Sequence, residues 1–155
     1  MSQHCGHRYV GQCHCGNIKY QFETERVLDA RNSRECQCEF CLMHRNLYQS
    51  DPDGKLVIDV GDAEQLNAYQ FGHQTANFLI CRTCGVMPVV TSEIDGQLYA
   101  VINVNCLQPR LVFAEGEAAV PVVYSDETVG PRLARRKKNW IADVTLTRNV
   151  GLKGN

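Results

Sequence analysis

Apolar residues alternate with polar ones in short runs along the first two thirds of the chain, and turn residues separate these runs. Short runs with a period of two are typical of strands that bury one face. The segments Asp51-Pro52-Asp53-Gly54 and Glu93-Ile94-Asp95-Gly96 favour tight reversals between such strands. The pattern predicts strands over residues 7–12, 17–23, 55–60, 66–71, 75–81, 86–91 and 98–104. We therefore expect a mainly β fold with antiparallel strands.

The last quarter of the chain has a different composition. Residues 128–139 predict a short helix, and Pro131 suits its first position. We expect residues 141–155 to form a tail and residues 1–7 a flexible arm, in which Cys5, His4 and His7 have no assigned role. The size of the chain favours one domain spanning residues 1–155.

Composition adds little to this picture. The chain is 44% hydrophobic and 21% charged, which is ordinary for a globular protein. It contains no apolar stretch of the roughly 20 residues needed to cross a bilayer. The first residues lack a basic region followed by an apolar run, so we expect no secretory signal. These observations predict a cytoplasmic protein that does not enter the membrane.

The charge is unevenly distributed although the net charge is only -1. Most of the basic residues in the C-terminal part lie in the run 132–138. Such a run can bind phosphate or another acidic ligand. More commonly it is the solvated face of a helix, and this interpretation is favoured here.

Nine cysteines are the unusual feature of the composition. Their number is odd, no secretory signal is expected, and a chain of this size can fold around a hydrophobic core without crosslinks. Clustered cysteines in a reducing compartment are better explained as metal ligands than as disulfides.

Seven of the nine cysteines fall into three clusters. Two are pairs, each followed directly by a glycine, and the third is a triple; the clusters are Cys13 and Cys15, Cys36, Cys38 and Cys41, and Cys81 and Cys84. Zinc prefers four ligands at tetrahedral angles, and a tight turn aims two thiolates at one point. A glycine after the pair relieves crowding where the backbone reverses. Three such clusters strongly indicate zinc.

Seven ligands do not fill two tetrahedra. The simplest grouping joins Cys13, Cys15, Cys81 and Cys84 into a closed structural site. The triple Cys36, Cys38 and Cys41 then holds a second ion with one position free, as catalytic zinc sites do. A thiol suits that position, because zinc deprotonates a thiol that coordinates it.

Other assignments stay open at this point. His44 could complete the second site and make it structural, while His14 is expected to point away from the metal. The triple could also be a metal-free, redox-active thiol cluster. Cys106 ends an apolar run and is interpreted as a buried core thiol rather than a ligand.

These motifs resemble the glutathione-dependent formaldehyde-activating enzyme family, also called the centromere-protein-V-like domain family. The resemblance is carried by the Cys-x-Cys-Gly segment and following strand at 11–20, the Cys-x-Cys-x-x-Cys segment at 36–41, and Phe71-Gly72 with 78–86. Residues 102–107 and 135–140 are similar to less specific features of the family. The stretch 42–47 departs from the basic, small and glycine residues that many relatives have there, so the substrate can differ.

The resemblance implies an antiparallel β-tent fold with two zinc ions. It implies that Cys13, Cys15, Cys81 and Cys84 hold the structural ion, and that Cys36, Cys38 and Cys41 hold the second ion near the substrate. The named reaction of the family joins glutathione and formaldehyde to give S-(hydroxymethyl)glutathione, and it is classed as a carbon–sulfur lyase by its reverse direction.

The leading hypothesis is therefore a zinc-dependent carbon–sulfur lyase acting on a thiol–aldehyde adduct, with glutathione as a possible co-substrate. Arg45 and Arg82 could pair with glutathione carboxylates, and His44 could transfer protons. The alternative is a non-catalytic zinc module for a protein or nucleic acid partner, supported by the run 132–138. Nucleic acid is not the expected partner, because basic and aromatic residues do not alternate. A redox or metal-storage protein is a third hypothesis.

Overall fold

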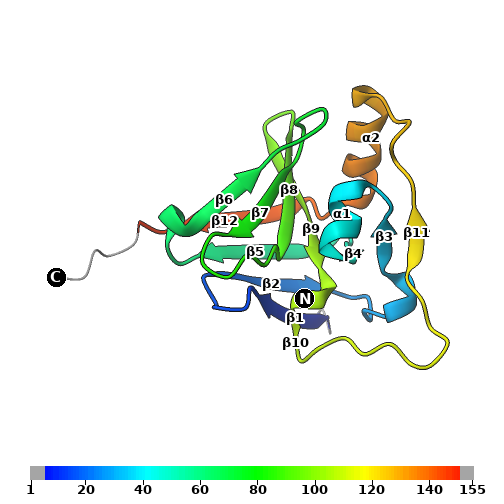
Figure 1. Cartoon of the computed structure of the whole chain (residues 1–155), viewed down its shortest axis with the longest axis horizontal. Coiled ribbons are helices and arrows are strands. Elements are labelled where there is room, and N and C mark those ends of the chain that lie inside the picture. The colour runs from blue at the N-terminus through cyan, green and yellow to red at the C-terminus, as the bar shows by residue number, and fades with distance from the viewer. Residues whose placement is uncertain (1–5, 151–155) are drawn as a thin grey trace, which may run out of the picture.

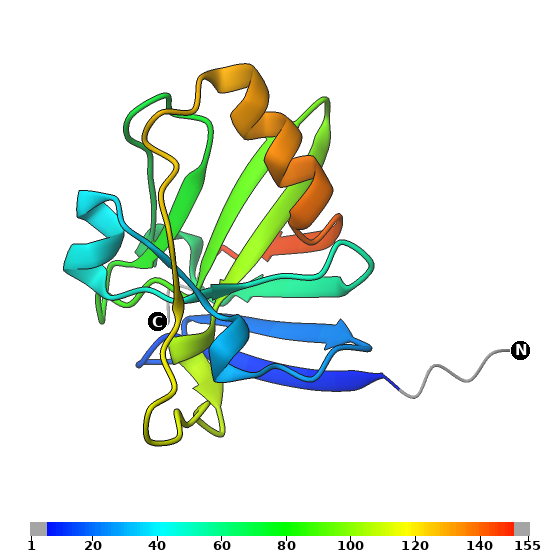
Figure 2. The same ribbon diagram turned by 90° about the vertical axis from the view of Figure 1, so that its right-hand side faces the viewer.

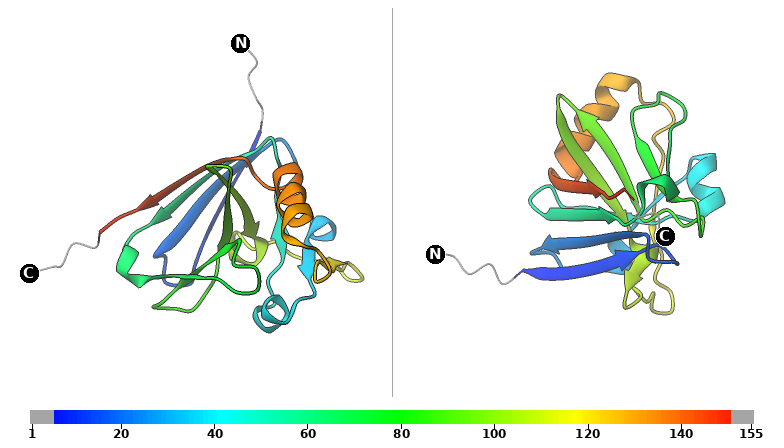
Figure 3. Two further views of the ribbon diagram at one scale, coloured as in Figure 1. Left: turned by 90° about the horizontal axis from the view of Figure 1, so that it is seen from above. Right: turned by 90° about the vertical axis from the view of Figure 1, so that its left-hand side faces the viewer.

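Two β-sheets form the framework of the protein in the computed structural model, which describes residues 6–150 (Figure 1). The first sheet contains β1 (His7–Gln12), β2 (Ile18–Thr24), β5 (Lys55–Val60), β10 (Leu107–Gln108) and β12 (Asp143–Arg148). The second contains β3 (Arg34–Cys36), β4 (Tyr48–Gln49), β6 (Leu66–Tyr69), β7 (Asn77–Cys81), β8 (Val89–Ile94), β9 (Gln97–Asn103) and β11 (Val120–Val122). The strand orders are β10-β1-β2-β5-β12 and β11-β3-β4-β9-β8-β7-β6. In Figure 3 strands β8 and β9 run at a steep angle to the strands of the first sheet.

Short helices complete the described part of the chain. They are α1 (Glu39–His44), α2 (Val129–Asn139) and the 3-10 helices η1 (Ala30–Asn32), η2 (Ala63–Gln65) and η3 (Val104–Cys106). Among residues 6–150, no helix has the length and apolar character needed to cross a membrane.

Strict alternation in β2 builds the core between the two sheets. Ile18, Tyr20 and Phe22 are buried, while the residues between them are exposed. They pack with Leu56 and Ile58 of β5 and with residues of the second sheet, namely Leu79, Val89, Ala100 and Ile102. The hydrophobic effect on this shared face therefore holds one sheet against the other.

The central strand β9 is covered on both faces. Ala100 and Ile102 belong to the core between the sheets, whereas Tyr99 and Val101 belong to a second core that includes Trp140, just after α2. Figure 2 shows the chain running up from β11 into α2 beside the β8–β9 hairpin. The second core thus lies on the side of β9 that faces away from the first sheet, and it is there that the candidate site is found.

Most of the predicted strands agree with the structure. The segments at 7–12 and 55–60 have the expected bounds, and Asp95 and Gly96 form the hairpin turn with φ of 52° and 79°. The predicted antiparallel arrangement does not hold at two sheet edges. There β12 pairs in parallel with β5, and β11 pairs in parallel with β3.

Three predictions for the chain ends also need correction. The tail at 141–155 contains β12, because Val144 and Leu146 alternate with exposed residues and pack against the first core. His7 begins β1 rather than ending an arm; residues 1–5, with His4 and Cys5, lie outside the described part. Pro131 occupies the third position of α2, since the helix begins at Val129 after Thr128.

Candidate metal and substrate site

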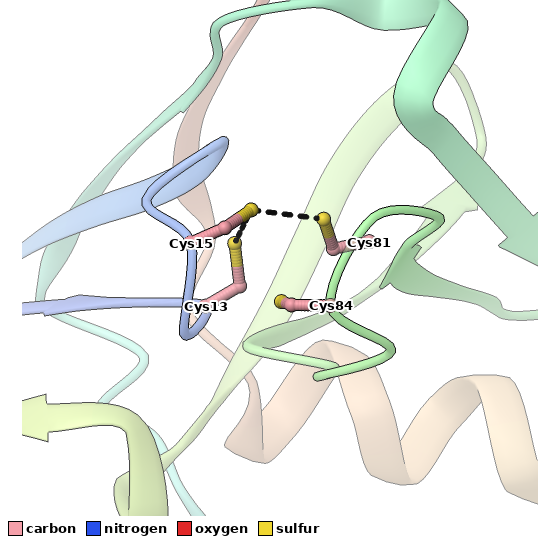
Figure 4. Close-up of side chains that lie close together, drawn as sticks. All are labelled: Cys13, Cys15, Cys81 and Cys84. Carbon is pink, nitrogen blue, oxygen red and sulfur yellow. Dashed lines mark hydrogen bonds between the residues drawn. The ribbon is translucent and has the colours of Figure 1, made fainter.

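Four cysteines from the two sheets converge at one point (Figure 4). Cys13 and Cys15 lie in the turn that connects β1 and β2, while Cys81 ends β7 and Cys84 lies in the loop after it. The sulfur atoms of this four-cysteine cluster all lie within 4.8 Å of one another. The cluster therefore joins the first sheet to the second.

The turns that present these sulfurs are built around glycine. Gly16 and Gly85 follow the two pairs with φ of 86° and 81°, a backbone conformation that favours glycine. The amide of Gly16 donates to the carbonyl of Cys13, and that of Gly85 to the carbonyl of Cys81. The expected role of the glycines in reversing the backbone is confirmed.

The spacing of the four sulfurs fits a tetrahedral metal. Zinc bonded to four sulfurs at about 2.3 Å places those sulfurs about 3.8 Å apart. The Sγ of Cys15 lies 3.8 Å from that of Cys13 and 3.5 Å from that of Cys81. A disulfide requires about 2.05 Å, and none of the cysteines among residues 6–150 forms one. The donor set and its spacing thus fit a metal ion bound by four thiolates.

The three-cysteine cluster lies at the start of α1. Cys36 ends β3, Cys38 caps the helix by accepting a hydrogen bond from the amide of Cys41, and Cys41 is only 3% exposed. The three Sγ atoms lie within 4.8 Å of one another, and among the described residues no histidine or carboxylate joins them at that distance. These residues fit a metal with three protein ligands and one position left for another molecule.

A series of hydrogen bonds connects Asn103, Asn46 and Tyr48 to Cys41. The amide of Asn103 donates to the side-chain oxygen of Asn46 at 3.1 Å, and Asn46 donates to the hydroxyl of Tyr48 at 3.2 Å. The Tyr48 hydroxyl lies 3.2 Å from the Sγ of Cys41. Because Tyr48 already accepts from Asn46, its own proton is free to point at a Cys41 thiolate.

The thiols of each cluster differ in acidity. A hydrogen bond from Cys41 lowers the pKa of Cys36 to about 6, and the same pair interaction, with burial, raises the pKa of Cys41. In the other cluster burial raises the pKa of Cys13 to about 12. Against the effect of burial, backbone hydrogen bonds at Cys15 and Val86 lower the pKa of Cys84 to about 6. Each cluster thus contains one thiol that ionises readily, as a metal ligand must.

The three-cysteine cluster forms part of the wall of a cavity of about 340 Å³. This volume is in the range of small-molecule sites, roughly 300–1,000 Å³. Apolar residues of the wall include Phe78, Val90, Val101 and Trp140. None of the four-cysteine cluster lines it. The two clusters therefore have different surroundings, one bracing the sheets and one facing a space where a ligand fits.

Four arginines also line the cavity: Arg34, Arg132, Arg135 and Arg136. Three of them come from α2, so the favoured interpretation of the run 132–138 as a solvated helix face was wrong for these residues. Only Lys137 and Lys138 of the five basic residues in the run are exposed. Residues spaced by three and four along a helix share one face, and here that face is turned toward the protein.

The other predicted site residues do not line this cavity. His44, Arg45 and Arg82 are exposed, and the ring of His44 packs on Phe40 with centroids 4.5 Å apart. Arg45 ends α1 with φ of 58°. Their roles in proton transfer and in glutathione binding stay predictions. His14 is exposed and outside the four-cysteine cluster, and Cys106 is buried in the core between the sheets, as expected.

Sequence reasoning missed Tyr48, Asn46 and the cavity arginines. Tyr48 lies seven residues beyond Cys41 in a two-residue strand too short to give a periodic signal. The spacing of Arg132, Arg135 and Arg136 does place them on one helix face. However, no apolar stripe indicated whether that face is turned toward the protein or toward solvent.

Replacing Tyr48 by phenylalanine should weaken metal binding at the three-cysteine cluster about 10-fold to 100-fold. Removal of a hydrogen bond to a metal ligand has effects of this size. Competition with a chromophoric zinc chelator would measure the change. The matched control is Tyr99→Phe, which removes a hydroxyl from the same buried core at a residue that belongs to neither cluster and does not line the cavity. Equal affinity in both variants would show that the Tyr48 hydroxyl does not support Cys41.

Comparison with known proteins adds independent information. Residues 8–120 match the family model described as glutathione-dependent formaldehyde-activating enzyme. The crystal structure of a Rhodobacter sphaeroides protein, a Northeast Structural Genomics target, is 30% identical and has a TM-score of 0.50 to this chain. The similarity covers 74% of this chain and 99% of that one. No curated protein is significantly similar to the chain. The family match includes both cysteine clusters and ends before α2.

Proposed function

The chain belongs to the glutathione-dependent formaldehyde-activating enzyme family, and from this premise we propose that it is a zinc-dependent enzyme of the carbon–sulfur lyase type. Its substrate is an adduct of a thiol and an aldehyde, for which S-(hydroxymethyl)glutathione is the model. The expected location in the reducing cytoplasm suits a protein that works with free thiols.

One observation carries the proposal. Three sulfurs converge on a cavity of small-molecule size without a fourth protein ligand among the described residues, while four other sulfurs form a complete set elsewhere. Structural zinc sites are closed and catalytic sites keep an open position. We therefore assign Cys13, Cys15, Cys81 and Cys84 to a structural zinc ion, and Cys36, Cys38 and Cys41 to a catalytic one.

A zinc ion held by Cys36, Cys38 and Cys41 would favour the deprotonated form of a substrate thiol. With three anionic ligands, it suits thiol activation better than polarisation of a carbonyl. The remaining tasks belong to the protein. Tyr48 orients Cys41 through its hydroxyl, and the apolar side chains of Phe78, Val90 and Val101 keep water from the reacting atoms.

The proposed reaction balances without a further reactant. In the direction of synthesis, a carbon–sulfur bond forms between the thiol sulfur and the aldehyde carbon. The thiol proton passes to solvent or a base, and the former carbonyl oxygen takes up one proton. The reverse direction breaks the same bond and returns the free thiol and aldehyde.

The alternative of a non-catalytic zinc module has less support than the sequence suggested. It depended on the basic run 132–138, and three of its five basic residues line the cavity. The exposed remainder, Lys137 and Lys138, is a small surface, and Lys137 pairs with Asp95 at 2.6 Å. We therefore retain the enzyme as the proposed function.

Adding glutathione and a panel of aldehydes to the zinc protein tests the proposal. Because these adducts also form spontaneously, the measurement is the exchange rate between free and adduct aldehyde by 13C NMR, with and without protein. We expect faster exchange for at least one aldehyde and loss of the acceleration when zinc is chelated. If no aldehyde exchanges faster and glutathione does not bind, the proposed function is wrong.

A further inference from the structure

Positive charge accumulates in the cavity beyond what the protein neutralises. Four guanidinium groups line it, and among the described residues that line it none is acidic. The nearest carboxylate with a defined contact is that of Glu127, which interacts with three of the arginines. Four positive charges thus face one carboxylate. Even a zinc ion with three thiolates would add only one further negative charge, so the cavity is left with a positive surplus.

That carboxylate is already engaged by Arg135. The Nε and Nη2 of Arg135 both donate to Glu127, at distances from 2.8 to 3.1 Å. The guanidinium also stacks on the ring of Tyr124, 3.5 Å from its centroid. A bidentate pair of this kind is stable and directional, so within residues 6–150 Arg135 is the one cavity arginine that forms an ion pair.

Arg136 is buried without such a partner. The residue is 6% exposed and its guanidinium packs over Trp140. Its Nη1 donates to the carbonyl and hydroxyl of Thr75 and to the hydroxyl of Ser92, which are neutral acceptors. Its buried Nε has no acceptor among the described residues. Burial accordingly lowers the pKa of Arg136 to about 10.

Arg132 and Arg34 are in a similar position. Arg132 donates to the backbone carbonyls of Tyr124 and Glu127, and its buried Nε has no acceptor among residues 6–150. Arg34 donates to the hydroxyl of Ser50 at 2.8 Å. Neither forms an ion pair within the described part of the chain. Keeping cations in a partly buried site is costly unless an anion neutralises them.

We infer that Arg34, Arg132 and Arg136 form an oxyanion-binding subsite, which selects small thiols that carry a carboxylate or a similar group. The thiol part of this inference rests on the proposed function, because it places the substrate sulfur at Cys36, Cys38 and Cys41. The subsite itself rests only on the arginines that line the cavity without an ion-pair partner among residues 6–150. Guanidinium groups bind planar oxyanions through paired hydrogen bonds, which explains why arginine rather than lysine occupies all three positions.

Binding of matched thiols to the zinc protein tests the subsite. We would compare 3-mercaptopropionate with its neutral amide, 3-mercaptopropionamide, by titration calorimetry. A third ligand, 2-mercaptoethanesulfonate, distinguishes a carboxylate preference from a general one for oxyanions. The wild-type protein should bind the anionic thiols at least about tenfold more tightly than the amide, as charge-assisted hydrogen bonds imply.

The variants are Arg136→Met and Arg34→Met. Each should reduce the affinity for 3-mercaptopropionate by about tenfold and leave that for the amide unchanged. The matched control is Lys138→Met, which removes a charge from the exposed side of α2 and should change neither affinity. Thermal unfolding checks each variant; if Arg136→Met does not fold, the less buried Arg34 position decides the result.

The outcomes separate the subsite from the reaction. Equal binding of the acid and the amide by the wild type, or unchanged selectivity in both variants, would overturn the subsite, and so would failure of every thiol to bind. Selective binding without any acceleration of aldehyde exchange would support the subsite and overturn the proposed reaction. Accelerated aldehyde exchange without a preference for anionic thiols would support the proposed reaction and overturn the subsite.

Discussion

Replacing Cys81 by serine is expected to remove the zinc ion that we propose for the four-cysteine cluster, and with it most of the folding stability. Cys81 is buried and its sulfur lies 3.5 Å from that of Cys15, on the other sheet. Structural zinc contributes on the order of 10 kcal/mol in small zinc domains. Whole domains are stable by only about 5–15 kcal/mol. Loss of the ion should therefore leave the variant largely unfolded at 37 °C, which circular dichroism and zinc analysis of the purified protein would reveal.

The control for this experiment is Cys106→Ala. Cys106 is a buried thiol of the same core that belongs to neither cluster. Its truncation should cost only about 1–2 kcal/mol, the size of a small core deletion, and should leave both ions bound. A Cys81→Ser protein with wild-type stability and two zinc ions would contradict the structural assignment of the four-cysteine cluster.

Replacing Cys36 by serine is expected to remove the other zinc ion and the activity without unfolding the protein. The variant should fold but retain one zinc ion instead of two, because the three-cysteine cluster does not connect the sheets. Acceleration of aldehyde exchange should fall by more than about 100-fold, since loss of a ligand exceeds the effect of losing a supporting hydrogen bond. Metal analysis, thermal unfolding and the exchange assay on one preparation would measure all three properties.

The pair of variants is more informative than either alone. If Cys36→Ser retains full activity with one ion, the reaction does not occur at the three-cysteine cluster. If it unfolds as Cys81→Ser should, both clusters are structural, and the protein is better explained as a zinc-binding module. The Cys106→Ala protein serves as the reference for the loss of a thiol in each case.

The fold explains why these two sites can have different roles. The four-cysteine cluster lies where the β1–β2 turn meets the end of β7, so its ligands come from both sheets. The three-cysteine cluster takes all its ligands from one short segment, the end of β3 and the start of α1. A cluster within a single segment constrains little of the remaining fold, and it can therefore face a cavity.

Local features of the structure were well predicted from the sequence. Alternation in residues 17–23 identified β2 to within one residue at each end, and the glycine after each cysteine pair identified the reversals at Gly16 and Gly85. The grouping of seven sulfurs into a set of four and a set of three followed from counting ligands, and the structure brings together the same two sets. The short strands β3, β4, β10 and β11 were missed, because two or three residues are too few to establish a period.

The sequence alone determined the kinds of ligand and their local spacing, because residues a few positions apart are placed by the backbone itself. The tertiary structure decided which groups meet across the chain. Cys15 and Cys81 are 66 residues apart, and Arg34 of β3 lines the same cavity as Arg136 of α2. Arg45 and Arg82 lie near cysteines in sequence but do not line the cavity, whereas Arg132, Arg135 and Arg136, far from every cysteine cluster in sequence, do. Proximity along the chain does not fix which way a side chain turns; packing of the two sheets and α2 does.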